Sequence, residues 1–242
     1  MTLKRTIRFL DNATDAVLLI IFLFFFLIGG YALYDSYRVY TDSYDNSLLR
    51  FKPGYEQEYV DGRQILKKKM AGWLTIDDTK VDYPVMQGET NNEFLNTDPY
   101  GDYSLTGSIF MDSRNSRDPE APDDITLIYG HHMAEGAMFG ALDAFEKVKY
   151  FDAHREGTFT LGKTAYRVRF FAYMISDATN DLIFNPTEVR QEDTMAYIRK
   201  DAAIFREEEL KNRKDLKIII LSTCKFPDST ERTLLIGALE KK

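Results

Sequence analysis

The chain has 242 residues and a formal net charge of −7 at pH 7, with 31 lysines and arginines against 38 aspartates and glutamates. This length is enough for one substantial hydrophobic core with appendages. The acidic balance argues against nucleic acid as a partner, because phosphate binding needs a concentrated basic surface. An aromatic content of 14% favours a β-rich or membrane-proximal protein over a disordered one.

An uncharged apolar stretch near the N-terminus runs from Ala16 to Leu33. As a helix it would be about 27 Å long, close to the roughly 30 Å of bilayer hydrocarbon. The alternative is a cleaved signal peptide, whose apolar core is usually about 7–15 residues long and ends in a small-x-small site. No such site is evident from Tyr31 to Tyr34. We therefore expect an uncleaved single-pass anchor, with membrane lipid as its partner.

Basic side chains precede the apolar stretch at Lys4, Arg5 and Arg8. The positive-inside rule then places the N-terminus in the cytoplasm and everything after the anchor outside the cell. The predicted organisation is a cytoplasmic stub (1–15), a transmembrane anchor (16–34), an extracellular stalk with an N-terminal helix (35–70) and a folded domain (71–242).

Strand patterns dominate the predicted domain. Before it, Pro53 and Gly54 should break any helix, and a weak helical pattern from Tyr55 to Met70 should pack on the domain. From there on, apolar, aromatic and β-branched runs are bounded by turn residues. The expected strands are 73–76, 81–85, 108–112, 125–129, 158–161, 166–175, 216–222 and 232–239. Roughly eight strands fit a closed barrel.

Three helices are expected between these strands. A capping-box pattern from Thr90 to Glu93 predicts a short helix that includes Phe94 and Leu95. A second helix is expected over 136–145, burying Met138, Leu142 and Phe145. A third, amphipathic helix is expected inside the long connection 176–215, from apolar residues at helical spacing. These residues are Met195, Ile198, Ala202 and Phe205.

Three reactive side chains stand where strands should end or begin. Cys224, the single cysteine, ends the apolar run 218–224, His131 ends the run 126–131, and Arg232 begins a further run. A thiol with a histidine partner is a candidate nucleophile, and a guanidinium can stabilise the negative charge that develops during attack. The alternative is a buried cysteine that acts only as a small apolar side chain.

The other residue patterns give no support for a metal or a nucleotide. The chain has three histidines, and the neighbours His131 and His132 should point to opposite sides of an extended strand. His154 lies in a polar stretch and is most simply a surface residue. No H-E-x-x-H, C-x-x-C, G-x-G-x-x-G or P-loop pattern is present.

Several segments resemble the sortase family. Leu221-Ser222-Thr223-Cys224 with Arg232 downstream resembles its T-L-x-T-C…R signature, although Ile220-Leu221 stands in place of Thr-Leu. The run 126–131 is similar to the segment that ends in the family's catalytic histidine. Four further segments resemble the class B branch of the family. They are 73–76, 81–87, 107–112 and the helix-like insertion around 187–212.

This resemblance implies a mainly β protein: a closed sortase-type barrel of about eight strands, with an N-terminal helical segment and a long helix inserted before the cysteine strand. Cys224 would be the nucleophile, His131 the acid and base, and Arg232 the stabiliser of the oxyanion or of the substrate backbone. The implied substrate-binding residues are Ser222, Thr223, Leu182, Ile183 and Asn92. The implied chemistry requires no cofactor.

The implied reaction is transpeptidation on the outer face of a Gram-positive cell. A C-terminal sorting signal of NPxTx-like form, carried by surface proteins, would be cleaved after Thr. The acyl group would pass to an amine of a peptidoglycan peptide or of its lipid-linked precursor. Three alternatives stay open: a cysteine endopeptidase with water as acceptor, a pilin-polymerising enzyme, and a non-catalytic membrane-tethered binding module.

Overall fold

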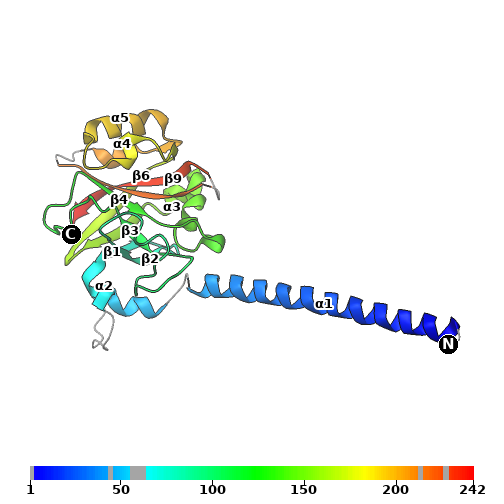
Figure 1. The fold of residues 1–242 in the computed structure, drawn as a ribbon. Coiled ribbons are helices and arrows are strands. Elements are labelled where there is room, and N and C mark those ends of the chain that lie inside the picture. The colour runs from blue at the N-terminus through cyan, green and yellow to red at the C-terminus, as the bar shows by residue number, and fades with distance from the viewer. Residues whose placement is uncertain (1–2, 43–45, 55–63, 212–214, 226–228) are drawn as a thin grey trace. The chain divides into compact units, whose positions relative to one another are not determined.

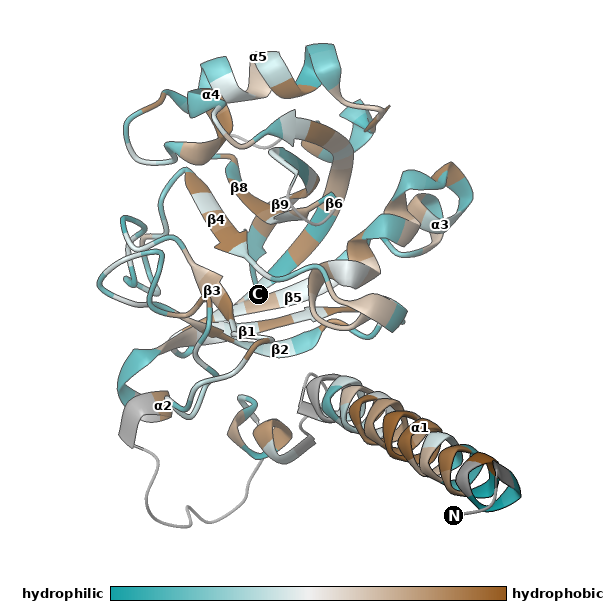
Figure 2. Ribbon diagram, turned by 45° about the vertical axis from the view of Figure 1, so that its right-hand side comes forward, coloured by the Kyte–Doolittle hydropathy of each residue, from teal (hydrophilic) through white to brown (hydrophobic). Residues whose placement is uncertain are grey.

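The structure is a computed structural model that describes residues 3–42, 46–54, 64–211, 215–225 and 229–242. It divides into two units, Met1–Asp42 and Ser43–Lys242. The described part of the first unit is one helix, α1 (Leu3–Asp42), and its stretch Ile7–Tyr37 is long and apolar enough to cross a membrane. Figure 2 shows this stretch as a hydrophobic run along α1. The helix extends beyond both ends of the uncharged segment seen in the sequence.

The second unit is built on a closed barrel of eight strands, as predicted. The strands follow the order β5, β1, β2, β3, β4, β8, β9, β6, and pairing of β5 with β6 closes the ring. A two-residue strand, β7 (Ile204–Phe205), adds to β6. The ring strands are β1 (Met70–Ile76), β2 (Asp82–Met86), β3 (Ile109–Met111), β4 (Ile125–Tyr129), β5 (Glu156–Leu161), β6 (Thr164–Asp177), β8 (Lys217–Cys224) and β9 (Glu231–Lys241).

Strand β8 is buried on both faces, which explains its unbroken apolar sequence. Ile219 and Leu221 belong to the core inside the barrel. Ile218 and Ile220 pack on the outer face, in a second core that the β6–β8 connection covers. This connection carries the helices α4 (Asp181–Phe184) and α5 (Gln191–Asp201), which lie over the barrel in Figure 1.

The segment before the barrel packs on it through a small apolar cluster. A 3₁₀ helix, η1 (Asn46–Phe51), contributes Leu48, and the helix α2 (Gln64–Lys69) contributes Leu66. Both pack with Trp73 of β1. The expected helix before the domain is therefore confirmed over its last turns, while its part at 55–63 lies outside the described residues.

The predicted helix 136–145 is wrong in type and extent. The chain forms two 3₁₀ segments, η2 (Ala134–Gly136) and η3 (Phe139–Glu146), separated at Met138 with φ 50°. A right-handed helix cannot continue through that conformation. The Met138 N–H donates instead to the hydroxyl of Tyr83, at 3.1 Å. Met138, Leu142 and Phe145 are nonetheless buried as expected.

Two further helix predictions need correction. Residues 91–95 form consecutive turns, because the Glu93 carboxylate accepts from the backbone of Glu89 and pairs with Lys69 rather than capping a helix at Thr90. The amphipathic helix ends at Asp201, and Phe205 pairs with Ala172 of β6 in strand β7. The remaining short elements are α3 (Val148–Ala153) and η4 (Glu207–Leu210).

Candidate active site

Backbone pairing brings the three reactive side chains to one end of the barrel. Cys224, the last residue of β8, is directly opposite Arg232 in the antiparallel pairing of β8 with β9. On its other edge β8 pairs in parallel with β4, where Tyr129 is opposite Ser222. The next residue, Gly130, donates its N–H to the Ser222 carbonyl at 3.1 Å, so His131 leaves the sheet beside the cysteine strand.

Gly130 lets the chain pass through a crowded point just before His131. A Cβ atom there would lie 2.4 Å from Ile109 and 2.7 Å from Phe139, closer than side chains approach one another. The backbone N–H of Phe139 then donates to the His131 carbonyl at 3.0 Å. The position of His131 therefore depends on a glycine that admits the close approach and on a backbone bond to η3.

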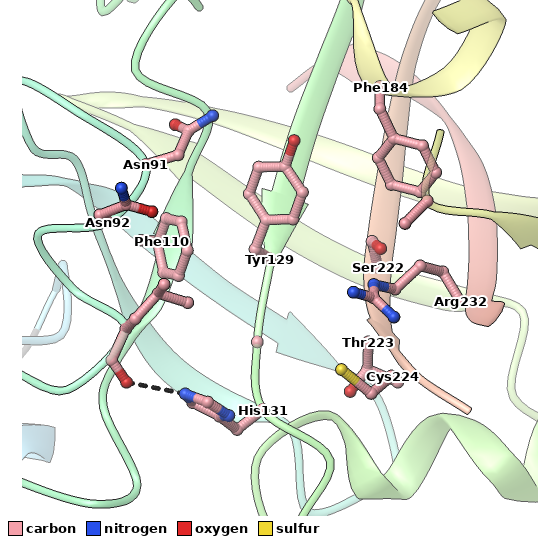
Figure 3. A pocket seen from close by; sticks show the side chains of 13 residues that line it. Asn91, Asn92, Phe110, Tyr129, His131, Phe184, Ser222, Thr223, Cys224 and Arg232 are labelled. Carbon is pink, nitrogen blue, oxygen red and sulfur yellow. Dashed lines mark hydrogen bonds between the residues drawn. The ribbon is translucent and has the colours of Figure 1, made fainter. Parts of the chain in front are cut away.

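A cavity of about 310 Å³ opens among these segments (Figure 3). In that view the sulfur of Cys224, which is a free thiol, lies between the imidazole of His131 and the guanidinium of Arg232. The residues that line the cavity are Asn91, Asn92, Leu95, Phe110, Tyr129, Gly130, His131, Ala178, Phe184, Ser222, Thr223, Cys224 and Arg232. All three predicted catalytic side chains are therefore at one cavity.

The two neighbouring histidines have different surroundings, as the alternation of strand side chains predicts. His131 Nε2 lies 2.7 Å from the carbonyl oxygen of Leu95. A carbonyl only accepts hydrogen bonds, so in the neutral ring Nε2 carries the proton and Nδ1 is the acceptor, with no partner among the described residues. His132 Nε2 instead contacts Asp143 at 2.6 Å, and neither residue lines the cavity. His154 stacks on Tyr150 elsewhere on the barrel, with ring centroids 3.9 Å apart.

Arg232 is held by backbone oxygens and keeps donors for a ligand. Its Nη1 donates to the carbonyls of Ser229 at 2.6 Å and Glu231 at 3.2 Å. Its Nε and Nη2 make no hydrogen bond to the described residues. Nearby, the pKa of Asp177 is lowered to about 2, first by hydrogen bonds from Thr179 and to a smaller extent by the charge of Arg232. Asp177 is thus ionised at neutral pH and partly balances the guanidinium.

Two hydroxyls beside the cysteine have no partner among the described residues. Ser222 and Thr223 are each 2% exposed, and both line the cavity. Neither Oγ atom makes a hydrogen bond within the described part of the chain. A buried hydroxyl without a partner is costly, so a ligand in the cavity would gain from bonding the Ser222 hydroxyl.

The remaining predicted substrate-binding residues divide into one inside the cavity and two outside it. Asn92 lines the cavity, whereas Leu182 and Ile183 are not among its lining residues. Ile183 is fully buried in the outer core beneath the insertion. Phe184 takes the place expected for these two residues, because the single turn of α4 directs only one side of its residues toward the barrel.

Several residues of the cavity wall were not predicted individually from the sequence: Asn91, Leu95, Phe110, Tyr129, Ala178 and Phe184. Tyr129 carried a usable signal, since it ends the same strand-like run that leads to His131. Phe110 lies in the predicted strand 108–112, and Asn91, Leu95, Ala178 and Phe184 come from connections whose course no local pattern specifies. Within the described residues, no group of three or more His, Cys, Asp or Glu side chains is placed to hold a metal ion.

Comparison with known proteins identifies the family. Residues 74–240 match the model of the sortase domain. The chain belongs to the sortase family. Sortase B of Listeria monocytogenes is 31% identical over 94% of this chain and 95% of that protein.

Solved class B sortases share its fold. Spy0129 of Streptococcus pyogenes, a class B sortase involved in pilus biogenesis, is 34% identical, with a TM-score of 0.64 over 72% of this chain and 93% of that one. The substrate complex of Staphylococcus aureus sortase B is 26% identical, with a TM-score of 0.64 over 73% and 82% of the two chains. The same enzyme complexed with triglycine gives 26% identity and a TM-score of 0.63 over 73% and 82%. This sortase is thus similar to class B members over its barrel.

A buried carboxylate, Asp112, supports the cavity from behind. It is fully buried and accepts hydrogen bonds from the Tyr129 hydroxyl and from the Asn91 side chain, each at 2.9 Å. Arg114 donates to both of its oxygens at 2.8 Å. Burial alone would raise the pKa of Asp112, but the bonds from Arg114, Tyr129 and Asn91 outweigh it and leave the pKa below its ordinary value.

This lowered pKa predicts a pH-dependent effect of Asp112→Asn on folding. The stabilisation is fully present above the unfolded-state pKa of about 3.9 and is lost as the pH falls through the folded-state pKa. We expect Asp112→Asn to cost about 3 kcal/mol in the free energy of unfolding at pH 7, and progressively less below about pH 4. Urea unfolding from pH 3 to pH 7 measures it. A cost that does not vary with pH would contradict the assignment.

Proposed function

We propose that this sortase is a membrane-anchored cysteine transpeptidase that cleaves an NPxTx-like sorting signal after Thr and joins the new acyl end to an amine. The observation that carries the proposal is the shared cavity of Cys224, His131 and Arg232, with Cys224 and Arg232 opposite each other on paired strands. A thiol, an imidazole and a guanidinium around one opening are the groups that acyl transfer through a thioester requires.

The first step is attack of the Cys224 thiolate on the carbonyl carbon of the scissile peptide bond. The thiol proton goes to His131 Nδ1, since Nε2 already donates to Leu95. In Figure 3 the second ring nitrogen of His131 lies on the side of the imidazole away from the dashed hydrogen bond. The carbonyl oxygen gains a negative charge, and the Nε and Nη2 atoms of Arg232, which donate to none of the described residues, stabilise it.

The second step breaks the C–N bond. His131 returns its proton to the leaving amine, and the acyl group stays on Cys224 as a thioester. An incoming amine then attacks the thioester carbonyl, passes a proton to the imidazole and releases the thiolate. The Ser222 hydroxyl, buried and without a partner among the described residues, is a donor for the bound peptide backbone or side chain.

The proposed function includes a membrane anchor and a defined orientation of the chain in the membrane. The apolar run of α1 supports a division into a cytoplasmic stub (1–15), an anchor (16–34), a stalk (35–70) and a catalytic domain (71–242). The basic residues before the anchor favour a cytoplasmic N-terminus and an extracellular active site. The substrates are then surface proteins that carry the sorting signal, and the acceptor is an amine of peptidoglycan or of its lipid-linked precursor. The triglycine complex of S. aureus sortase B supports an amine acceptor.

Two other acceptors of the acyl group would be compatible with the same site. With water as acceptor, the enzyme would be an endopeptidase. With a protein lysine as acceptor, it would polymerise pilins, a variant that the similarity to the pilus-associated Spy0129 favours. A non-catalytic binding module would need no reactive thiol at all.

Acceptor competition tests the proposal. The full-length chain in detergent micelles is mixed with a library of sorting peptides and with triglycine, a lysine peptide or no amine, and the products are followed by mass spectrometry. We expect cleavage after Thr and an amine-linked product that increases with amine concentration at the expense of the hydrolysed one. Cleavage that never yields an amine-linked product would favour the endopeptidase.

A matched pair of histidine substitutions tests the assignment of the acid and base. We expect His131→Gln to lower kcat at least about a hundredfold, because the leaving amine loses its proton donor. His132→Gln should leave kcat nearly unchanged, since His132 is bonded to Asp143 outside the cavity. Steady-state cleavage of one peptide by both variants measures the contrast. Equal losses in both would contradict the assignment.

A further inference from the structure

The buried Asp112 has no role in the proposed acyl transfer, and neither it nor its partner Arg114 lines the cavity. The two side chains make a fork-to-fork pair, with Arg114 Nε on one carboxylate oxygen and Nη2 on the other. The backbone N–H of Arg114 also donates to Asp112, at 3.0 Å. Because the guanidinium is planar, this arrangement fixes the direction of the whole side chain.

Arg114 also reaches a distant part of the chain. Its Nη1 donates to the side-chain oxygen of Asn185 at 2.7 Å, and its Nη2 donates to the Phe184 carbonyl at 2.7 Å. These residues lie at the end of α4, in the insertion between β6 and β8. One guanidinium therefore ties the β3–β4 connection to the insertion.

The hydrogen bonds of Asp112 and Arg114 connect the two walls of the cavity. Asn91 and Tyr129 form one wall, and both hydrogen-bond to Asp112. Phe184 belongs to the other wall, and its carbonyl is held by Arg114. In Figure 3 the rings of Tyr129 and Phe184 lie on different elements beside the opening that leads to Cys224. The Asp112–Arg114 pair thus connects the two walls through hydrogen bonds.

Other contacts hold α4 to the barrel but do not fix the distance between the two walls. Ile183 is buried in the outer core, and the Thr194 hydroxyl of α5 donates to the Leu182 carbonyl at 2.7 Å, within the insertion. Gln191, at the start of α5, donates to the carbonyls of Asp124 and Leu216, which holds α5 rather than the end of α4. Apolar burial is non-directional, so it keeps α4 on the barrel without specifying its lateral position. Within the described residues, the hydrogen bonds that reach the end of α4 from outside the insertion come from Arg114.

We propose that Asp112 and Arg114 are positioning residues for the substrate peptide, which hold the Tyr129 wall and the Phe184 wall at the spacing that a bound peptide needs. The inference rests on the proposed function, because it concerns the affinity of the same cavity for its peptide. The pair acts through Tyr129, Asn91 and Phe184 and touches neither the peptide nor the thiol. Its loss should therefore weaken peptide binding and leave the chemistry of Cys224 unchanged.

The test compares Arg114→Met with Arg190→Met in the full-length chain in detergent micelles. Arg190 is a matched control, since it makes a similar two-bond pair with Asp193 at 2.9 Å on the same insertion, with its side chain 74% exposed. Two quantities are measured: KM and kcat for a cleaved sorting peptide, and the rate at which iodoacetamide alkylates Cys224. Iodoacetamide is small, so its reaction with the thiol should not depend on the spacing of the cavity walls.

We expect Arg114→Met to raise KM roughly tenfold, with kcat and the alkylation rate within about twofold of the wild type. Arg190→Met should change none of the three. If Arg114→Met does not fold, Tyr129→Phe serves instead: it keeps the ring, removes the bond to Asp112 and should also raise KM.

Two results would overturn the inference alone: an unchanged KM in a folded variant that only melts at a lower temperature, or equal losses in kcat and alkylation rate. Absence of turnover by the wild type with every peptide, despite normal alkylation, would overturn the proposed function and this inference with it.

Discussion

Hydrogen bonding between β8 and β9 sets Cys224 opposite Arg232, and the arrangement of the site follows from that register. Because strand side chains alternate between faces, a shift by one residue would turn the thiol away from the guanidinium and into the barrel. The apolar residues of β8 prevent such a shift. Ile219 and Leu221 pack in the inner core, and Ile218 and Ile220 pack in the outer one. A shift of β8 by one residue would move each pair into the core that now holds the other.

The parallel pairing of β4 with β8 adds the third group. It places Tyr129 beside Ser222, and Gly130 then carries the chain past Ile109 and Phe139 to His131. The Leu95 carbonyl holds one nitrogen of the imidazole, and the proposed proton transfers use the other: it would accept the proton of the thiol and return it to the leaving amine. The insertion that covers the outer core also supplies Phe184 to the cavity. The same element therefore completes the packing of the barrel and the wall of the site.

Long periodic segments could be predicted from the sequence, while short connections could not. The eight ring strands and the apolar helix were predictable because their residues repeat a local pattern over many positions. The helix expected at 136–145 was wrong because Met138 adopts φ 50°, a conformation fixed by its tertiary contact with Tyr83. The expected helix after Thr90 was wrong because Glu93 bonds Lys69, a partner from another element.

The residues of the site also differ in how well they could be predicted from the sequence. Cys224 and Arg232 are opposite each other on paired strands, and His131 follows the end of β4 by two residues, so strand pairing brings the three segments to one end of the barrel. Leu182 and Ile183 were expected at the cavity, but the single turn of α4 buries Ile183 in the core and presents Phe184 instead. Arg114, the partner of Asp112, also donates a hydrogen bond to Asn185, which is 71 positions away in the sequence. No local pattern indicates such a contact.

In the proposed reaction Cys224 carries the acyl group. Acid quenching of a reaction with a cleavable sorting peptide, followed by mass spectrometry of the intact chain, detects this intermediate directly. We expect an added mass equal to the acyl part of the peptide up to Thr, mapped to Cys224. This added mass should be absent in Cys224→Ala and should be lost faster when triglycine is added. Peptide cleavage without any adduct on Cys224, or cleavage that persists in Cys224→Ala, would show that another group carries out the reaction.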